Sequence, residues 1–285
     1  MKHWPQKVVA SLLFFTFAPL ISAPIVFDLG DVLIETHYLQ SVLTVGPIKM
    51  VSYALTLQNP FSCHKKLYRL LDKIKAPDYS TIATHDHHGN RLPQLMVDWL
   101  KGELTPEELI SILQRHYDRC DNWIEILLIR ALANTIFTPE NFAATRYLVP
   151  EGIEFVKACR AAGHEPYIIS NWDPHSFSFL QETYPDFFNL FTGIIISGDV
   201  GLVKPDPAIY RFLTNYYKLD TTQCYFIDDR EENVAAAQEL GMNAILYQKK
   251  SGLFFNWSDF DTIRDYINAK ESLKDFPMLI NYNGY

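Results

Sequence analysis

The sequence lacks the features that would assign it to zinc, redox or nucleic-acid proteins. Its four cysteines are widely separated and form no Cys-x-x-Cys pair, so neither a zinc motif nor a redox motif is present. The formal net charge is −8, and the lysines and arginines are dispersed, so no basic stripe is available to neutralise a phosphate backbone. Nucleic acid is therefore not an expected partner. We interpret the cysteines as buried thiols: Cys63, Cys120, Cys159 and Cys224.

The amino terminus contains a hydrophobic leader, residues 1–23. Two lysines precede an apolar stretch that ends in Ile-Ser-Ala, as an export signal does. Pro24 is a poor residue directly after a signal-peptidase cut, and the stretch is short for a membrane span, which needs about 20 apolar residues. We expect an export signal or an uncleaved anchor, and thus a periplasmic, secreted or membrane-anchored protein. A buried or partner-binding leader and a cytoplasmic location stay open, and membrane contact is expected only through residues 8–23.

The order of helical and strand patterns predicts an α/β fold with a helical insert. A buried strand begins at Pro24, after which the sequence to Tyr147 is mainly helical in pattern. Within it, Thr105 and Pro106 mark a helix start. From Val149 onward, helices alternate with strands, which predicts a parallel sheet covered on both faces. The further predicted strands are Glu165–Ile169, Gly193–Ser197, Gln223–Ile227 and Asn243–Tyr247.

Four short segments place polar residues directly after apolar ones. Three of them begin with an aliphatic and aromatic run, as expected for strands buried in a parallel sheet whose carboxyl ends open on a crevice. We place the active site in that crevice. The segments are Ile25–Val32, Tyr167–Asn171, Val203–Asp206 and Tyr225–Asp229.

The polar residues of these segments suit phosphate and Mg²⁺ chemistry. Asp28 ends the first run, and a carboxylate there can attack phosphorus, while Gly30 allows a sharp turn. Asp228 and Asp229 supply the hard oxygen ligands that Mg²⁺ prefers, and burying two acids together requires a cation.

The remaining two segments offer groups that can hold a phosphate. Ser170 and Asn171 provide a hydroxyl and the backbone N–H groups of a helix start. Lys204 brings the positive charge that neutralises a phosphoryl group.

In this combination the chain resembles the haloacid dehalogenase superfamily of phosphohydrolases, over roughly residues 24–247. The resemblance implies a Rossmann-like core at residues 24–34 and 148–250 and an all-helical cap at residues 35–147. The cap would close over the site and select the substrate. A carboxyl-terminal helix and tail would follow at residues 251–285. It implies that Asp28 is the nucleophile, and that Mg²⁺ is held by Asp28, the backbone carbonyl of Gly30 and Asp228, with Asp229 in support. Phosphate would be bound by Ser170, Asn171 and Lys204.

One position departs from the family pattern. Most phosphatases of the superfamily carry a second Asp two residues after the nucleophile, where it protonates the leaving oxygen, and here that position is Gly30. Asp31 follows, but we expect it to point elsewhere. The Phe-Asp-Leu-Gly-x-Val form resembles the α-glucose-1-phosphate phosphatase branch. We therefore expect a phosphomonoester hydrolase that favours sugar phosphates, or aryl phosphates including phosphotyrosine, as a small molecule or in a phosphoprotein.

Two other functions stay open. A non-catalytic phosphate-binding module would keep the phosphate site but would have lost catalysis together with the acidic residue that Gly30 replaces. A haloacid dehalogenase would use the same Asp28 without metal, but the pair Asp228-Asp229 and the small Gly30 argue against it. In the cap, we interpret His85-Asp86-His87-His88 as an exposed turn rather than a metal site.

Overall fold

The computed structural model describes residues 23–54, 63–86, 88–120, 122–251, 256–257 and 259–271. The leader up to residue 22 and the tail after residue 271 lie outside this part, and so do the predictions made for them. No helix in the described ranges is both long enough and apolar enough to span a bilayer.

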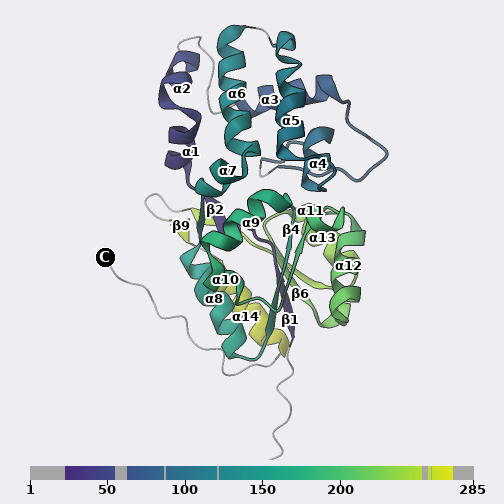
Figure 1. Cartoon of the computed structure of the whole chain (residues 1–285). Coiled ribbons are helices and arrows are strands. Elements are labelled where there is room, and N and C mark those ends of the chain that lie inside the picture. Colours follow the sequence, from purple (N-terminus) through teal and green to yellow (C-terminus); the bar gives the residue numbers. More distant parts are fainter. Residues whose placement is uncertain are drawn as a thin grey trace, which may run out of the picture.

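Five parallel strands form the central sheet, in the order β5-β4-β1-β6-β7 (Figure 1). The first strand lies in the middle, with Phe27 in register with Ile168 on one side and Ile227 on the other. Because the carboxyl ends of parallel strands meet at one edge, the residues that follow these three strands come together there. The strands are β1 (Pro24–Phe27), β4 (Glu165–Ser170), β5 (Gly193–Ile196), β6 (Tyr225–Asp228) and β7 (Asn243–Leu246).

Alternate side chains of the strands enter two hydrophobic cores, one on each face of the sheet. Ile25 and Phe27 enter the first core, where Phe155 and Phe260 stack with ring centroids 4.9 Å apart. Val26 enters the second. The first face is covered by α8 (Pro150–Ala161), α9 (Pro174–Thr183), α10 (Pro185–Phe188) and α14 (Phe260–Glu271), and the second by α12 (Pro207–Tyr217) and α13 (Glu231–Glu239). The α/β fold predicted from the sequence is confirmed.

The helical insert packs above the carboxyl edge of the sheet (Figure 1). It has a hydrophobic core of its own, in which Trp99 contacts Phe137 edge to face at 5.1 Å. Thr105 begins α5 with a reciprocal capping box to Glu108, as predicted. The helices are α1 (Tyr38–Val45), α2 (Pro47–Ala54), α3 (Cys63–Ile74), α4 (Gln94–Leu100), α5 (Pro106–Gln114), α6 (Trp123–Phe137) and α7 (Pro139–Ala144), with a short 3-10 turn at Tyr117–Arg119.

The chain enters and leaves the cap through a two-stranded antiparallel ribbon that the sequence analysis did not find. β2 (Ile34–Thr36) pairs with β3 (Arg146–Leu148), and the Arg146 guanidinium donates a hydrogen bond to the Thr36 hydroxyl. Three-residue strands are too short for a recognisable alternation of apolar and polar residues. The ribbon holds the two crossings between core and cap side by side.

Several element ends and one cysteine differ from expectation. The predicted strand at Gly193–Ser197 ends at Ile196, because Ser197 begins α11 (Ser197–Val200), and Gln223 belongs to a 3-10 turn (Thr221–Gln223) before β6. A short hairpin, β8 (Lys250–Ser251) and β9 (Asn256–Trp257), precedes α14. Cys159 and Cys224 are buried, but Cys120 is only partly buried because it follows a surface turn. The Cys63 side chain lies outside the described part.

Candidate active site

The turn after β1 places Asp28 at the carboxyl edge of the sheet. Its backbone N–H donates to the carbonyl of Ile227 at 2.8 Å, and the Leu29 N–H donates to Asp28 Oδ1 at 2.7 Å. Asp28 is 7% exposed. Gly30 and Asp31 follow it along the cavity wall. The backbone thus holds one oxygen of Asp28, and the carboxylate is at the site predicted for the nucleophile.

Lys204 lies between the carboxylates of two strands. Its Nζ is 2.7 Å from Asp28 Oδ1 and 2.6 Å from Asp228 Oδ2, and its side chain is 1% exposed. The Asn171 side chain fixes the lysine backbone, since Asn171 Oδ1 accepts from the Lys204 N–H at 2.8 Å and Nδ2 donates to the Lys204 carbonyl at 2.9 Å. The Asn171 side chain therefore positions Lys204, and the groups left for phosphate at this strand end are the Ser170 hydroxyl and backbone N–H groups.

Three carboxylates meet at this edge. Oxygens of Asp28, Asp228 and Asp229 all lie within 4.8 Å of one another, and in the described part of the chain no other set of acidic, histidine or cysteine side chains is close enough to hold a metal ion. Asn233, on the first turn of α13, donates to both Asp228 oxygens at 3.0 and 3.1 Å. Arg230 pairs with Asp229 through Nε at 3.2 Å.

The electrostatics of this cluster fit a divalent cation. Burial raises the pKa of Asp28 to about 6; the Lys204 charge opposes this rise and the Asp228 charge adds to it. Burial raises the pKa of Asp229 to about 8, with further contributions from Asp28 and Asp228. Lys204 and Arg230 together bring two positive charges to three gathered carboxylates. A hard cation such as Mg²⁺, which prefers carboxylate oxygens, suits this donor set.

The cluster forms the floor of a cavity of about 250 Å³ between the sheet edge and the cap. Ser170, Asn171, Lys204 and Asp229 line it together with Asp28. The structure therefore brings together all the residues that the sequence analysis named.

Two side chains around Gly30 were not anticipated. A Cβ at Gly30 would lie 3.7 Å from the ring of Trp172, so the indole covers the position where most related phosphatases carry their acid. Asp31, expected to point elsewhere, lines the cavity, and its charge contributes to the raised pKa of Asp229. Asp31 has a left-handed backbone, with φ of 58°, a conformation that Asp tolerates better than most residues.

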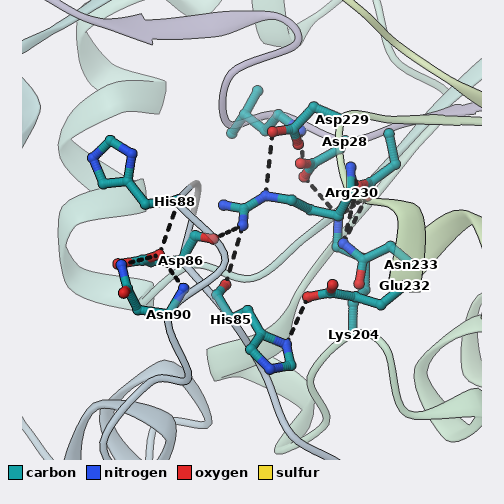
Figure 2. A network of polar contacts seen from close by, with 12 residues as sticks. Asp28, His85, Asp86, His88, Asn90, Lys204, Asp229, Arg230, Glu232 and Asn233 are labelled. Atoms are coloured by element: carbon teal, nitrogen blue, oxygen red, sulfur yellow. Dashed lines mark hydrogen bonds and ion pairs between the residues drawn. The ribbon is translucent and has the colours of Figure 1, made fainter.

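The cap loop that contains His85 and Asp86 is an exposed turn only in part: His88 and Gly89 are exposed, but His85 is half-buried and Asp86 is buried. Asp86 Oδ1 accepts from the N–H groups of His88 and Asn90 at 2.9 and 2.8 Å. The Arg230 guanidinium donates to the carbonyls of His85 and Asp86, as Figure 2 shows.

Two further contacts attach the same loop to the core. His85 Nδ1 lies 3.0 Å from a carboxylate oxygen of Glu232, and the Thr84 hydroxyl donates to the Lys204 carbonyl at 3.2 Å (Figure 2 shows the first). These contacts cannot be predicted from sequence patterns, because each joins residues more than a hundred positions apart. Only the place of Arg230, directly after Asp229, hinted at a role near the site.

Comparison with known proteins identifies the family. The family model for haloacid dehalogenase-like hydrolases matches residues 25–241. The chain belongs to the haloacid dehalogenase-like hydrolases.

Two fungal proteins are similar in sequence over part of their length. A drimenol cyclase, drtB, of Aspergillus calidoustus is 26% identical over 54% of this chain and 27% of its own length. A sesquiterpene phosphatase, astK, of Aspergillus oryzae is 31% identical over 30% of this chain and 44% of its own length. The chain thus spans less than half the length of these relatives.

A solved structure shares the fold. The family enzyme bt-2542 of Bacteroides thetaiotaomicron, in complex with magnesium and inorganic phosphate, superposes with a TM-score of 0.51 at 16% identity, covering 82% of this chain and 98% of that one. At this identity the likeness shows the fold alone. The specific resemblance to the α-glucose-1-phosphate phosphatase branch stays a prediction.

Proposed function

We propose that the protein is a Mg²⁺-dependent phosphomonoester hydrolase that works through a phosphorylated Asp28. The observation that carries this proposal is Lys204, fully buried and in contact with both Asp28 and Asp228. A buried lysine between two carboxylates is costly to desolvate, and folding alone does not require it. Membership of a hydrolase family and a relative named as a phosphatase support the same conclusion.

The reaction divides into two displacements at phosphorus. An oxygen of Asp28 attacks, the bond from phosphorus to the leaving oxygen breaks, and an aspartyl phosphate forms. Water then attacks that phosphorus, inorganic phosphate leaves, and the Asp28 carboxylate is restored. Lys204 keeps its charge throughout and neutralises the phosphoryl oxygens and the attacking carboxylate.

The residues assigned to the cation are Asp28, the Gly30 carbonyl and Asp228, with Asp229 in support. When bound, Mg²⁺ supplies positive charge that screens the repulsion between the carboxylates and the phosphate. Asn233 and the Arg230 N–H orient Asp228 through its oxygens. Ser170 and the backbone N–H groups beside it bind the phosphoryl oxygens.

The absence of an acid at Gly30 restricts the substrates. Without an acidic side chain two residues after the nucleophile, the leaving oxygen departs readily only when it is already stable as an anion. Anomeric sugar phosphates and aryl phosphates meet this condition, whereas simple alkyl phosphates are expected to be slow.

Phosphate release from a panel of phosphoesters tests the proposal. We compare wild type with Asp28→Asn, each with Mg²⁺ and with chelator, and expect a loss of at least about a thousandfold in Asp28→Asn and in chelator. Phosphate binding without any turnover would instead indicate the non-catalytic module. Metal-independent release of halide from haloacids would indicate a dehalogenase.

A further inference from the structure

Apolar side chains line the cavity above Asp28 together with the polar cluster around Lys204. They come from β2, the cap and the loop after β4, and most of them are buried: Ile34, Leu92, Trp99, Leu100, Phe142 and Trp172. We call the surface that these six side chains form the apolar end of the cavity. Trp172 lies next to Gly30, two residues after Asp28, so a phosphoester bound at Asp28 would have apolar surface beside its leaving group.

Polar side chains of the cap also line the cavity, but their polar atoms already have partners. The Thr84 hydroxyl is bonded to the Lys204 carbonyl, His85 to Glu232, and Asp86 to Asn90. The hydroxyl groups of a sugar lose hydrogen bonds to water on entering a protein cavity and need replacements there. At Thr84, His85 and Asp86 a sugar hydroxyl would have to compete with contacts that these side chains already make.

The apolar end contains three aromatic rings that pack against one another and form a continuous wall. Phe142 meets Trp172 at 5.4 Å with planes at 68°, and Trp99 at 6.4 Å with planes at 86°. Arg146 covers one face of Phe142, with its guanidinium carbon 4.0 Å from the ring centre. Aromatic walls of this kind bind flat or compact apolar groups well.

We propose that this protein selects phosphoesters whose leaving group is a compact apolar group, such as an aromatic ring or a short branched hydrocarbon, over sugar phosphates. The proposal rests on the proposed phosphomonoesterase function, because it names the substrate class of the same site. The cavity volume of about 250 Å³ suits one ring beside the phosphate rather than a long chain.

The test compares benzyl phosphate with glucose 6-phosphate. Both are esters of primary alcohols with similarly poor leaving oxygens, so a difference in kcat/KM reports how the cavity binds the leaving group. We expect kcat/KM for benzyl phosphate to be higher by at least about tenfold, since even one methylene in an apolar pocket is worth that much. Equal values, or a preference for the sugar phosphate, would overturn the proposal.

A pair of matched variants ties the preference to the cavity. Phe142→Ala removes a half-buried ring that lines the cavity, and Phe212→Ala removes a half-buried ring on α12 that does not. We expect Phe142→Ala to lower the ratio of the two kcat/KM values by about tenfold and Phe212→Ala to leave it unchanged. An unchanged ratio in both variants would contradict the assignment of the apolar end.

Acetyl phosphate separates this proposal from the proposed function. Its leaving group is small and stable, so its hydrolysis reports the Asp28 chemistry without using the apolar end. Turnover of acetyl phosphate together with a preference for the sugar ester would leave the phosphatase function standing and refute the substrate class. If acetyl phosphate is not hydrolysed, calorimetry compares the binding of benzylphosphonate with that of methylphosphonate. Binding of benzylphosphonate that is about tenfold tighter supports the apolar end as a binding site for the leaving group. Equal affinities for the two phosphonates refute the proposed substrate class.

Discussion

At the scale of single residues, the site depends on the ion pairs of Lys204. Replacing it by methionine leaves Asp28 and Asp228 buried without a positive partner, which costs about 3–5 kcal/mol of unfolding free energy. We expect Lys204→Met to lose that much stability in chelator and to be inactive. Denaturant unfolding measures the first effect and phosphate release the second.

Lys157→Met is the matched control for this lysine. Lys157 pairs with Glu154 at 2.9 Å, but both side chains are about half exposed, at 53% and 52%. Such exposed pairs contribute about 0–1 kcal/mol. Equal stability losses in the two variants would show that the Lys204 pairs carry no special role.

The raised pKa values of Asp28 and Asp229 predict how stability depends on pH. Because the folded protein raises these pKa values, to about 6 and about 8, it favours the protonated carboxyls. That stabilisation is complete below the ordinary Asp pKa of about 4 and is lost as the pH rises through 6 and 8. In chelator, we expect the unfolding free energy of wild type to fall between pH 6 and pH 8 more steeply than that of Asp229→Asn. Identical slopes would contradict the raised pKa of Asp229.

The sequence predicted the site residues better than their surroundings. Asp28, Ser170 and Asp228 each end a buried apolar run, so a parallel sheet must bring them to one edge. The prediction that Asp31 points away from the cavity was wrong, because its left-handed backbone is not visible in a pattern of residue types. The indole of Trp172 over Gly30 depends on long-range packing, which spacing along the chain does not reveal.

At the scale of elements, Arg230 connects the turn after β6 to the cap loop. Its side chain pairs with Asp229 and donates to the carbonyls of His85 and Asp86 (Figure 2). We expect Arg230→Gln to loosen the loop and to raise amide hydrogen exchange across residues 84–92. Arg211→Gln, at an exposed position on α12, is the control and should leave this exchange unchanged. Unchanged protection in Arg230→Gln would show that the other contacts hold the loop without it.

The elements themselves were predicted with uneven success. The strands β1, β4 and β6 have buried runs of four or five residues, and helices such as α5 carry caps that the sequence displays. The ribbon of β2 and β3 has neither a long buried run nor a capping motif that would predict it. The cap loop resembles a turn in its composition, with His, Asp, Gly and Asn, although contacts to the core bury part of it.

At the scale of the whole molecule, the cap sits on the core through a close backbone contact. The Ser197 hydroxyl donates to the Leu100 carbonyl at 2.6 Å, and a Cβ at Gly102 would lie 2.4 Å from the Gly198 carbonyl oxygen. Gly102 also has φ of 70°, which disfavours any other residue. The turn after α4 therefore docks on α11 only because position 102 is glycine.

This contact predicts a difference between two glycine substitutions. Gly102→Ala introduces both backbone strain and a clash between the new Cβ and the Gly198 carbonyl oxygen. Gly89→Ala introduces backbone strain alone, because Gly89 has φ of 75° and no atom lies within 4 Å of the added Cβ. We expect Gly102→Ala to be less stable than Gly89→Ala by about 1–3 kcal/mol in thermal or denaturant unfolding, as overpacking costs in other interiors. Equal stabilities would mean that the cap can shift away from the core without loss.

The most direct test of the account is to find the phosphoryl group on the protein during turnover. Wild-type protein is mixed with acetyl phosphate and Mg²⁺, quenched in acid within a single turnover, digested, and examined by mass spectrometry. The account predicts a phosphoryl group on the peptide that contains Asp28, absent in chelator and absent in Asp28→Asn. Undiminished phosphate release by Asp28→Asn, or a phosphoryl group on another residue, would contradict it.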